Sequence, residues 1–182
     1  AVVIEDATLS DRFQAVVLAD VNEAATSPLL MQTYLARSGV RPINASVDVS
    51  NYLMLLTGQP THAYDYHKVR AIAGNDFTIR VRSAREGEQL TLLDGKAITL
   101  DPSDVVIAAG ETAVALAGIM GGSATAVDAT TKVVLFEAAT FNLYKMRGSQ
   151  MRHGVFSDAV TRFTKGIPAA LSTPVLFKAV AL

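Results

Sequence analysis

The chain has 182 residues, which corresponds to about one domain, and its 50% hydrophobic and 18% charged residues favour a folded protein with a core over a disordered one. With 16 Lys and Arg against 17 Asp and Glu the net charge is -1, which excludes a domain that depends mainly on phosphate neutralisation, although a local basic patch is compatible with it. The absence of cysteine excludes disulfides, thiolate metal sites, iron–sulfur clusters and cysteine nucleophiles.

The chain carries no signal for a membrane or for secretion. No apolar run approaches the roughly 18 residues of a membrane helix, and the N-terminal residues lack the basic region of a signal peptide. The chain begins without an initiator Met and stops inside an apolar, helix-like stretch. We therefore expect residues 1–182 to be a single domain cut from a longer polypeptide.

The first part of the chain predicts a strand followed by two helices. The run over 13–21 is apolar and rich in Val, as in a buried strand. Ser27 is a good N-cap and Pro28 suits the first helical position, so a helix is expected from there to Gly39, a residue type that commonly ends helices. A second helix is expected over 47–56.

The middle of the chain changes to the period of two that is typical of half-buried strands, beginning with the segment FTIRVRS at Phe77. Asp94-Gly95 is a strong hairpin signal. Short strands are then predicted over 105–108, 113–117 and 132–136, and helices over 141–150, over 158–165 and from Pro168 onward. This order favours an α+β fold, with a mixed or antiparallel β-sheet core and flanking helices, over a regular βαβ alternation.

His62 follows a turn in the segment GQPTHAYD and is the first candidate for chemistry. It can act as a general base or orient a water molecule, or it can be a structural histidine with satisfied hydrogen bonds. Together with Asp65 and His67 it could be imagined as a metal ligand, but the spacing fits no dependable ligand pattern. We therefore predict no metal site.

The glycine-containing bend AGIMGG over 117–122 joins two predicted strands. Glycines allow positive φ and close approach of backbone to a neighbour, so the bend is either a tight turn or the wall of a pocket. No Lys-Ser or Lys-Thr follows these glycines, which argues against a phosphate-binding loop.

Glu137 stands at the end of the apolar strand over 132–136 and precedes two alanines. A carboxylate in such surroundings is expected to be at least partly buried, and a buried carboxylate needs a hydrogen-bond partner. That partner is either structural or a hydroxyl of a ligand, and periodicity alone leaves both open.

The densest basic stretch contains Lys145, Arg147, Arg152 and His153, together with Gln150. It could face phosphates, but a solvated helix face is the commoner explanation for such a run.

Several short segments together resemble one family, the B3/B4 region of the β subunit of bacterial phenylalanyl-tRNA synthetase. They occur in family order from about residue 10 to the C-terminus. The matching segments are GVRPIN (39–44), VDVSNYLM (47–54), GQPTHAYD (58–65), TLLDG (91–95), ALAGIMGG (115–122), LFEAA (135–139), and SDA with RF and KG (157–166). Each segment alone is a weak signal, whereas the set is highly specific.

The resemblance implies an editing domain that hydrolyses tyrosine wrongly esterified to the phenylalanine tRNA. The family's pocket residues correspond to Arg41, Asn51, His62, Gly121, Glu137, Ser157 and Ala159. The family often has Thr at Ser157, and the chain departs from the family pattern at Val160 and Thr164, neither of which is a pocket residue.

The implied roles follow from the chemistry of the two amino acids. A pocket that requires a hydroxyl discriminates tyrosine from phenylalanine far better than an apolar pocket does, and Glu137 is the natural acceptor for that hydroxyl. Gly121 and Ala159 would leave room for the ring, and His62 and Asn51 would hold the attacking water. Arg41 would contact the terminal phosphate or the carbonyl, or brace the pocket.

The resemblance also implies partners and location: the 3′ end of the phenylalanine tRNA, the rest of the β subunit, the α subunit, and the cytoplasm. No motif for aminoacyl-adenylate synthesis is present, so ATP and Mg²⁺ are assigned to a site elsewhere in the full enzyme and no cofactor to this segment. The alternative is a non-catalytic module, tRNA-binding or structural, within the β subunit.

Overall fold

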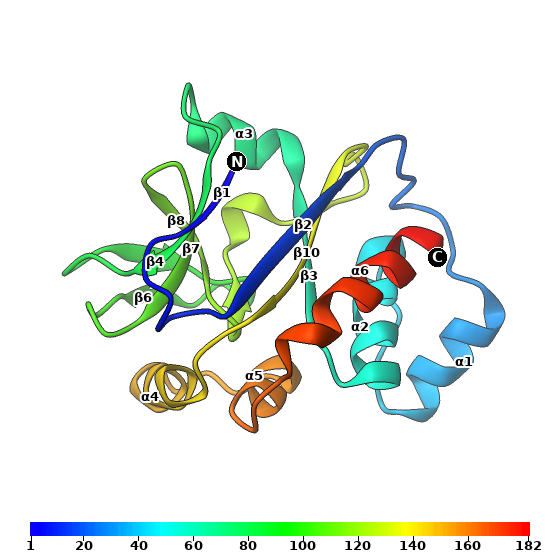
Figure 1. Cartoon of the computed structure of the whole chain (residues 1–182). Coiled ribbons are helices and arrows are strands. Elements are labelled where there is room, and N and C mark those ends of the chain that lie inside the picture. Colours follow the sequence, from blue (N-terminus) through cyan, green and yellow to red (C-terminus); the bar gives the residue numbers. More distant parts are fainter.

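The largest sheet of the computed structural model, which describes residues 1–182, is mixed and has five strands in the order β1-β4-β7-β8-β9 (Figure 1). Only β1 and β4 pair in parallel, and the other neighbours are antiparallel. The strands are β1 (Val2–Ile4), β4 (Ile79–Ser83), β7 (Val105–Ala109), β8 (Thr112–Leu116) and β9 (Met120–Gly121).

A second, antiparallel sheet has β10 between β2 and β3. Its strands are β2 (Arg12–Leu18), β3 (Thr61–Asp65) and β10 (Val134–Thr140). The predicted hairpin forms a small third sheet from β5 (Gln89–Thr91) and β6 (Ala97–Thr99), and Gly95 in its turn has φ +85.

Six α-helices flank the sheets, which confirms the predicted α+β class with a mixed sheet core. They are α1 (Leu29–Arg37), α2 (Ala45–Thr57), α3 (Tyr66–Ala73), α4 (Leu143–His153), α5 (Asp158–Phe163) and α6 (Ser172–Ala181), with short 3-10 turns at Ser123–Thr125 and Ala169–Leu171. In Figure 1, α2 and α6 cover the side of the three-stranded sheet that faces away from the larger sheet.

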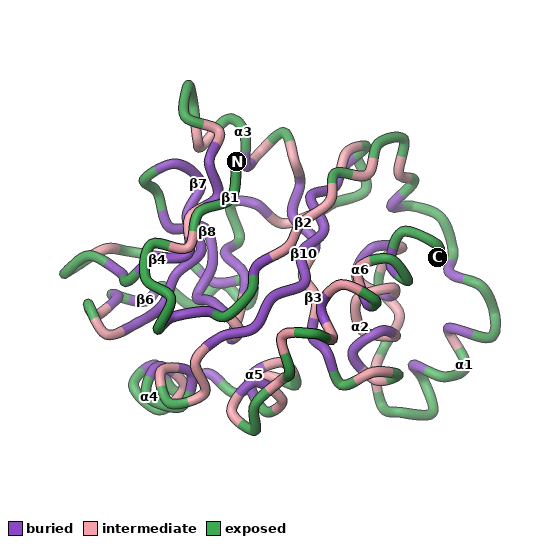
Figure 2. The backbone as a smooth tube through the Cα atoms, viewed as in Figure 1, coloured by how far each residue is buried: buried purple, intermediate pink, exposed green.

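Strand β10 is buried along its whole length (Figure 2) and contributes side chains to two hydrophobic clusters. Because side chains alternate along a strand, Leu135 and Ala139 face a main cluster of 28 buried residues shared with the larger sheet. Val134 and Phe136 face the opposite way, into a smaller cluster with α2 and α6. Because both faces of β10 are buried, its sequence is apolar at nearly every position.

The structure differs from the sequence predictions at several places, and strand β1 was not predicted. Ser27 does not cap α1: its hydroxyl donates instead to Asp48 of α2 at 2.7 Å, and α1 has no side-chain cap. The segment after His62 is a strand that leads directly into α3, with Asp65 accepting from the first backbone N–H groups of that helix. Strand β10 continues to Thr140, so that Glu137 lies in the middle of a strand and not at its end.

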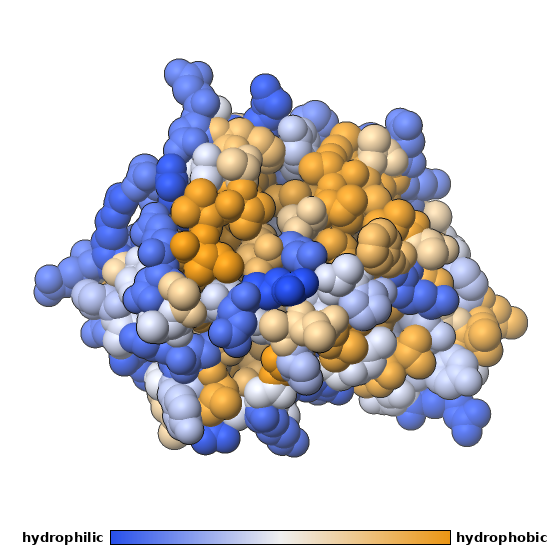
Figure 3. Space-filling model, in the orientation of Figure 1, coloured by the Kyte–Doolittle hydropathy of each residue, from blue (hydrophilic) through white to orange (hydrophobic).

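Some apolar side chains remain on the surface. They include Val2 and Val3 of β1 and Val17 of β2, and Figure 3 shows hydrophobic surface over these two strands. None of the helices combines the length and the apolar character that crossing a membrane requires.

Candidate functional site

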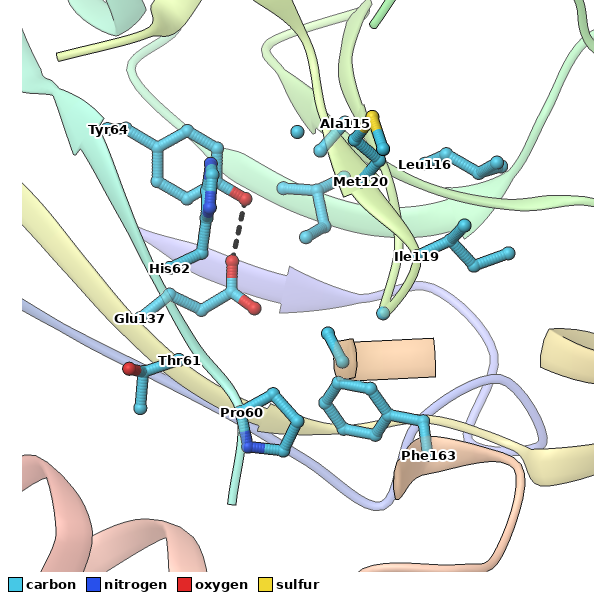
Figure 4. A pocket seen from close by; sticks show the side chains of 14 residues that line it. Pro60, Thr61, His62, Tyr64, Ala115, Leu116, Ile119, Met120, Glu137 and Phe163 are labelled. Atoms are coloured by element: carbon cyan, nitrogen blue, oxygen red, sulfur yellow. Dashed lines mark hydrogen bonds between the residues drawn. The ribbon is translucent and has the colours of Figure 1, made fainter. Parts of the chain in front are cut away.

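A small cavity lies between the three-stranded sheet, the edge of the larger sheet and α5 (Figure 4). Its empty volume is about 390 Å³, counting the part open to solvent. Four of the predicted site residues line it: His62 from β3, Gly121 from β9, Glu137 from β10 and Ala159 from α5. Most of the remaining wall is apolar, so this is a pocket for a small group with few polar contacts.

Glu137 lies directly opposite His62 across the β10–β3 pairing and on the same face of the sheet. The residue is 5% exposed, and Oε2 of its carboxylate accepts a 2.6 Å hydrogen bond from the Tyr64 hydroxyl. Burial raises the pKa of Glu137 to about 7, an effect that the hydrogen bond from Tyr64 partly offsets. The protein donates no hydrogen bond to the other oxygen, Oε1. In Figure 4 this oxygen is directed toward the space beside Ile119 and Phe163.

The His62 imidazole contacts the same tyrosine. Its ring meets the Tyr64 ring edge to face, with centroids 4.3 Å apart and an interplanar angle of 83°. Desolvation lowers the pKa of His62 to about 4. The imidazole is therefore neutral at neutral pH and retains a lone pair that can accept a proton or a hydrogen bond from water.

The position of the His62 imidazole leaves no room for a side chain at position 121, so a glycine is required there. A Cβ atom at this position would lie 2.5 Å from Nε2 of His62 and 2.6 Å from its Cε1. The space that the absent side chain leaves is thus filled by the histidine ring, in addition to bordering the cavity. At Gly122 a Cβ atom would lie 2.5 Å from the carbonyl oxygen of Val114, so this glycine allows two backbone segments to approach closely.

Ser157 stands next to the cavity without lining it. It is the N-cap of α5, where its hydroxyl accepts from the backbone N–H of Val160 at 3.1 Å and donates to the carbonyl of Ile119 at 2.8 Å. These bonds attach α5 to the glycine-containing bend. Ser157 therefore positions Ala159, which contributes a short side chain to the cavity wall.

Asn51 lies in a neighbouring groove that includes α2 and shares Thr61 and His62 with the cavity. The empty volume of this groove is about 900 Å³, again counting the part open to solvent. Arg41 is exposed and lines neither space. The structure therefore gathers the predicted residues into a cavity and an adjacent groove, with Arg41 outside both.

The basic stretch of α4 divides into two parts. Arg152 and His153 bind Asp104, whose buried carboxylate also accepts from Ser149 at 2.6 Å, and His153 Nε2 lies 2.6 Å from it. These groups attach α4 to the loop before β7. Arg147 is exposed, as on a solvated helix face.

His62 and Asp65 are three positions apart in β3 and so point to opposite faces of the strand, and His67 lies in α3. Asp65 caps α3 and accepts from the Thr131 hydroxyl at 2.6 Å, whereas His67 is exposed. The structure contains no cluster of three or more His, Asp or Glu side chains arranged to hold a metal ion.

Tyr64 is the cavity residue that the sequence analysis missed. It is 1% exposed and contacts both titratable candidate residues, Glu137 by a hydrogen bond and His62 by its ring. The period of two in a strand could have identified it. Residues two apart in a strand share a face, so a strand predicted at β3 would have placed Tyr64 beside His62.

The fold and the cavity define an α+β domain with a small, mostly apolar pocket containing one carboxylate and one imidazole. The model of the B3/4 domain matches residues 9–182, and the chain therefore belongs to this family. Its relatives include the phenylalanine–tRNA ligase beta subunits of Lactobacillus johnsonii, 45% identical over 141 residues, and of Bordetella pertussis, 43% identical over 169 residues. The two alignments cover 78% and 93% of this chain. They confirm the family resemblance found in the sequence.

The chain spans about a fifth of the length of these relatives, 17% and 20%. A solved structure with a similar fold is an N-terminal fragment of the phenylalanyl-tRNA synthetase beta subunit from Pyrococcus horikoshii, with a TM-score of 0.54 and 13% identity. It covers 84% of this chain and 48% of that fragment. At this level of identity the likeness establishes the fold alone.

Proposed function

We propose that this domain is an editing module, which hydrolyses the ester between tyrosine and the phenylalanine tRNA. The observation that carries the proposal is that Glu137, a buried residue, has an oxygen, Oε1, that receives no hydrogen bond from the protein and faces a small, mostly apolar cavity. A tyrosine ring entering the cavity donates its phenolic O–H to this oxygen in a charge-assisted hydrogen bond. A phenylalanine ring would remove water from this oxygen without donating a hydrogen bond to it, so phenylalanine binding is disfavoured.

The proposed reaction is direct attack of water on the ester carbonyl. The carbon–oxygen bond to the terminal ribose breaks, and the water proton passes to the ribose oxygen. Neutral His62 and Asn51 orient the water, because the imidazole lies at the boundary between the cavity and the groove that contains Asn51. A pKa of about 4 makes His62 a weak base, which favours orientation of water over complete proton removal.

The adjacent groove is the proposed place for the terminal nucleotide of the tRNA. It meets the cavity at Thr61 and His62, so a nucleotide in the groove and a tyrosine ring in the cavity would place the ester near the imidazole. Because the chain has a net charge of -1, most phosphate contacts are assigned to other parts of the synthetase.

The proposal extends to the setting of the module. It places the domain in the β subunit of a cytoplasmic synthetase, associated with the α subunit. ATP and Mg²⁺ then act at the site of aminoacylation elsewhere in that enzyme. Family membership and the named relatives support this assembly.

The test is deacylation of Tyr-tRNA and Phe-tRNA, both on the phenylalanine tRNA, by a ligase whose β subunit contains this chain. Glu137→Ala should lose at least about tenfold in kcat/KM for Tyr-tRNA, since one hydrogen bond to a charged group is removed, and should retain the slow rate for Phe-tRNA. Glu86→Ala is the matched control, because Glu86 is an exposed glutamate far from the cavity lining. Unchanged clearance of tyrosine by Glu137→Ala would contradict the proposal and favour a non-catalytic module.

A further inference from the structure

We infer that Tyr64 is the positioning residue that sets the specificity of the cavity, because its hydroxyl holds one oxygen of Glu137 and leaves the other as the acceptor that a ligand can reach. This inference rests on the proposed function and extends it. Tyr64 acts through Glu137 and touches no reacting atom, so it is a positioning residue and not a catalytic one.

Tyr64 is itself rigidly held. Its ring belongs to the main hydrophobic cluster, and its backbone pairs with Leu135 of β10 on one side and with Ala126 on the other. The residue is 1% exposed, so its hydroxyl has no access to bulk water and is satisfied by Glu137 at 2.6 Å. The hydroxyl is therefore a fixed donor at a fixed point of the cavity wall.

Glu137, in contrast, has a flexible side chain in a strand with apolar neighbours. With no donor nearby, its carboxylate could rotate and offer either oxygen, or neither, to a ligand. The bond from Tyr64 to Oε2 removes that freedom before any ligand arrives, and the remaining oxygen, Oε1, is directed into the cavity (Figure 4). A preorganised acceptor binds a donor more tightly because less freedom is lost on binding.

The arrangement also determines how many donors the cavity accepts. A carboxylate with both oxygens free would pair with ligands of different shape and hydroxyl position. With Oε2 occupied by Tyr64, Glu137 offers one free oxygen to a ligand in the cavity, which matches a side chain with one hydroxyl at the end of a ring. The His62 ring rests edge-on against the same tyrosine, so Tyr64 also fixes the orientation of the imidazole.

The experiment compares Tyr64→Phe with Tyr66→Phe in a ligase whose β subunit contains this chain. The two changes remove the same atom, but the Tyr66 ring packs on Phe77 and lies outside the cavity lining. Tyr64→Phe should reduce kcat/KM for Tyr-tRNA about tenfold, mainly through KM, with little change for Phe-tRNA. Tyr66→Phe should leave both rates unchanged.

The pH profile separates positioning from a purely structural role. The hydrogen bond from Tyr64 lowers the pKa of Glu137, so Tyr64→Phe should move the acid limb of Tyr-tRNA deacylation to higher pH. Replacing Tyr64 by 3-fluorotyrosine keeps the ring and makes the hydroxyl a stronger donor, so the limb should move to lower pH. This second variant serves as the test where Tyr64→Phe fails to fold.

Two results overturn the inference in different ways. If the Tyr64 variants retain the Tyr-to-Phe ratio and the pH profile while Glu137→Ala loses discrimination, Tyr64 has no positioning role and the proposed function stands. If Glu137→Ala itself retains discrimination, the proposed function fails and the inference fails with it.

Discussion

Glu137 and His62 lie opposite each other on adjacent strands. Desolvation favours the neutral form of both side chains over the charged form. Desolvation penalises a charged group of either sign, so the pKa of the acid rises and that of the base falls. At the residue scale the cavity therefore holds a carboxyl group that titrates near neutrality and an imidazole that is uncharged there. Such shifts are common where side chains serve a function as well as where they serve structure.

Gly121 provides the first test at this scale. Gly121→Ala places a methyl group 2.5 Å from Nε2 of His62, and the ring cannot move freely because it also packs against Tyr64. We expect a loss of about 1–3 kcal/mol in the free energy of unfolding, as for other overpacked sites, together with reduced deacylation. Urea denaturation of the chain measures the first effect.

Gly148→Ala is the matched control for this change. Gly148 lies in the middle of α4, and a Cβ atom there would have no neighbour within 4 Å. Because alanine is the better helix former, this variant should gain about 0.5–1 kcal/mol. Equal stabilities for the two variants would show that His62 adjusts to the methyl group at no cost.

At the scale of elements, one hydroxyl helps to hold α5, whose residues Val160 and Phe163 also pack in the main hydrophobic cluster. Ser157→Ala removes both the N-cap of the helix and the bond to the carbonyl of Ile119. Loss of an N-cap costs about 1 kcal/mol, and α5 has only 6 residues, so we expect local fraying that displaces Ala159. Hydrogen exchange at the amide of Val160 should accelerate in Ser157→Ala and stay unchanged in Ser157→Thr, which retains the cap. Unchanged exchange in both variants would contradict this role.

Sequence reasoning located elements with a clear hydrophobic period, and also short, continuously apolar strands such as β7 and β10. Strand β4 alternates and the helices α1 and α2 repeat at helical spacing, and each forms close to the predicted range. Strand β3 was missed because its sequence THAYD carries polar residues on both faces, and α3 because it follows β3 with no intervening turn residue. In both places tertiary partners supply what the local sequence does not show.

Dependence on tertiary partners also explains which site residues could be predicted from the sequence and which could not. Family motifs pointed to His62, Gly121, Glu137 and Ala159, which the fold brings to one cavity. The apolar pattern stopped at Phe136, because a carboxylate inside a fully buried strand breaks it. Its partner Tyr64 is 73 positions away in the sequence, and no local rule predicts such a pair.

At the scale of the whole molecule, the desolvated Glu137 and His62 give the folded state opposite pH dependences. The pKa of Glu137 rises from 4.5 to about 7 on folding, so the folded protein binds this proton more tightly and the associated stability is lost as pH rises through 7. The pKa of His62 falls from 6.5 to about 4, so stability is lost as pH falls from 6.5 toward 4. Between about pH 4.5 and 6.5 the two contributions oppose each other.

Replacing one of the two residues should therefore remove its contribution to the pH dependence of the free energy of unfolding. Glu137→Gln should become more stable relative to the unmodified chain as pH rises from 4.5 to 7.5, by on the order of 3 kcal/mol over the full shift. His62→Gln should show the opposite trend and gain relative stability as pH falls below 6.5. Urea denaturation of the three proteins at several pH values measures both differences, and subtraction removes the titration of all other carboxylates. If both differences are independent of pH, the two groups titrate alike in the folded and unfolded chain, and the cavity does not desolvate them.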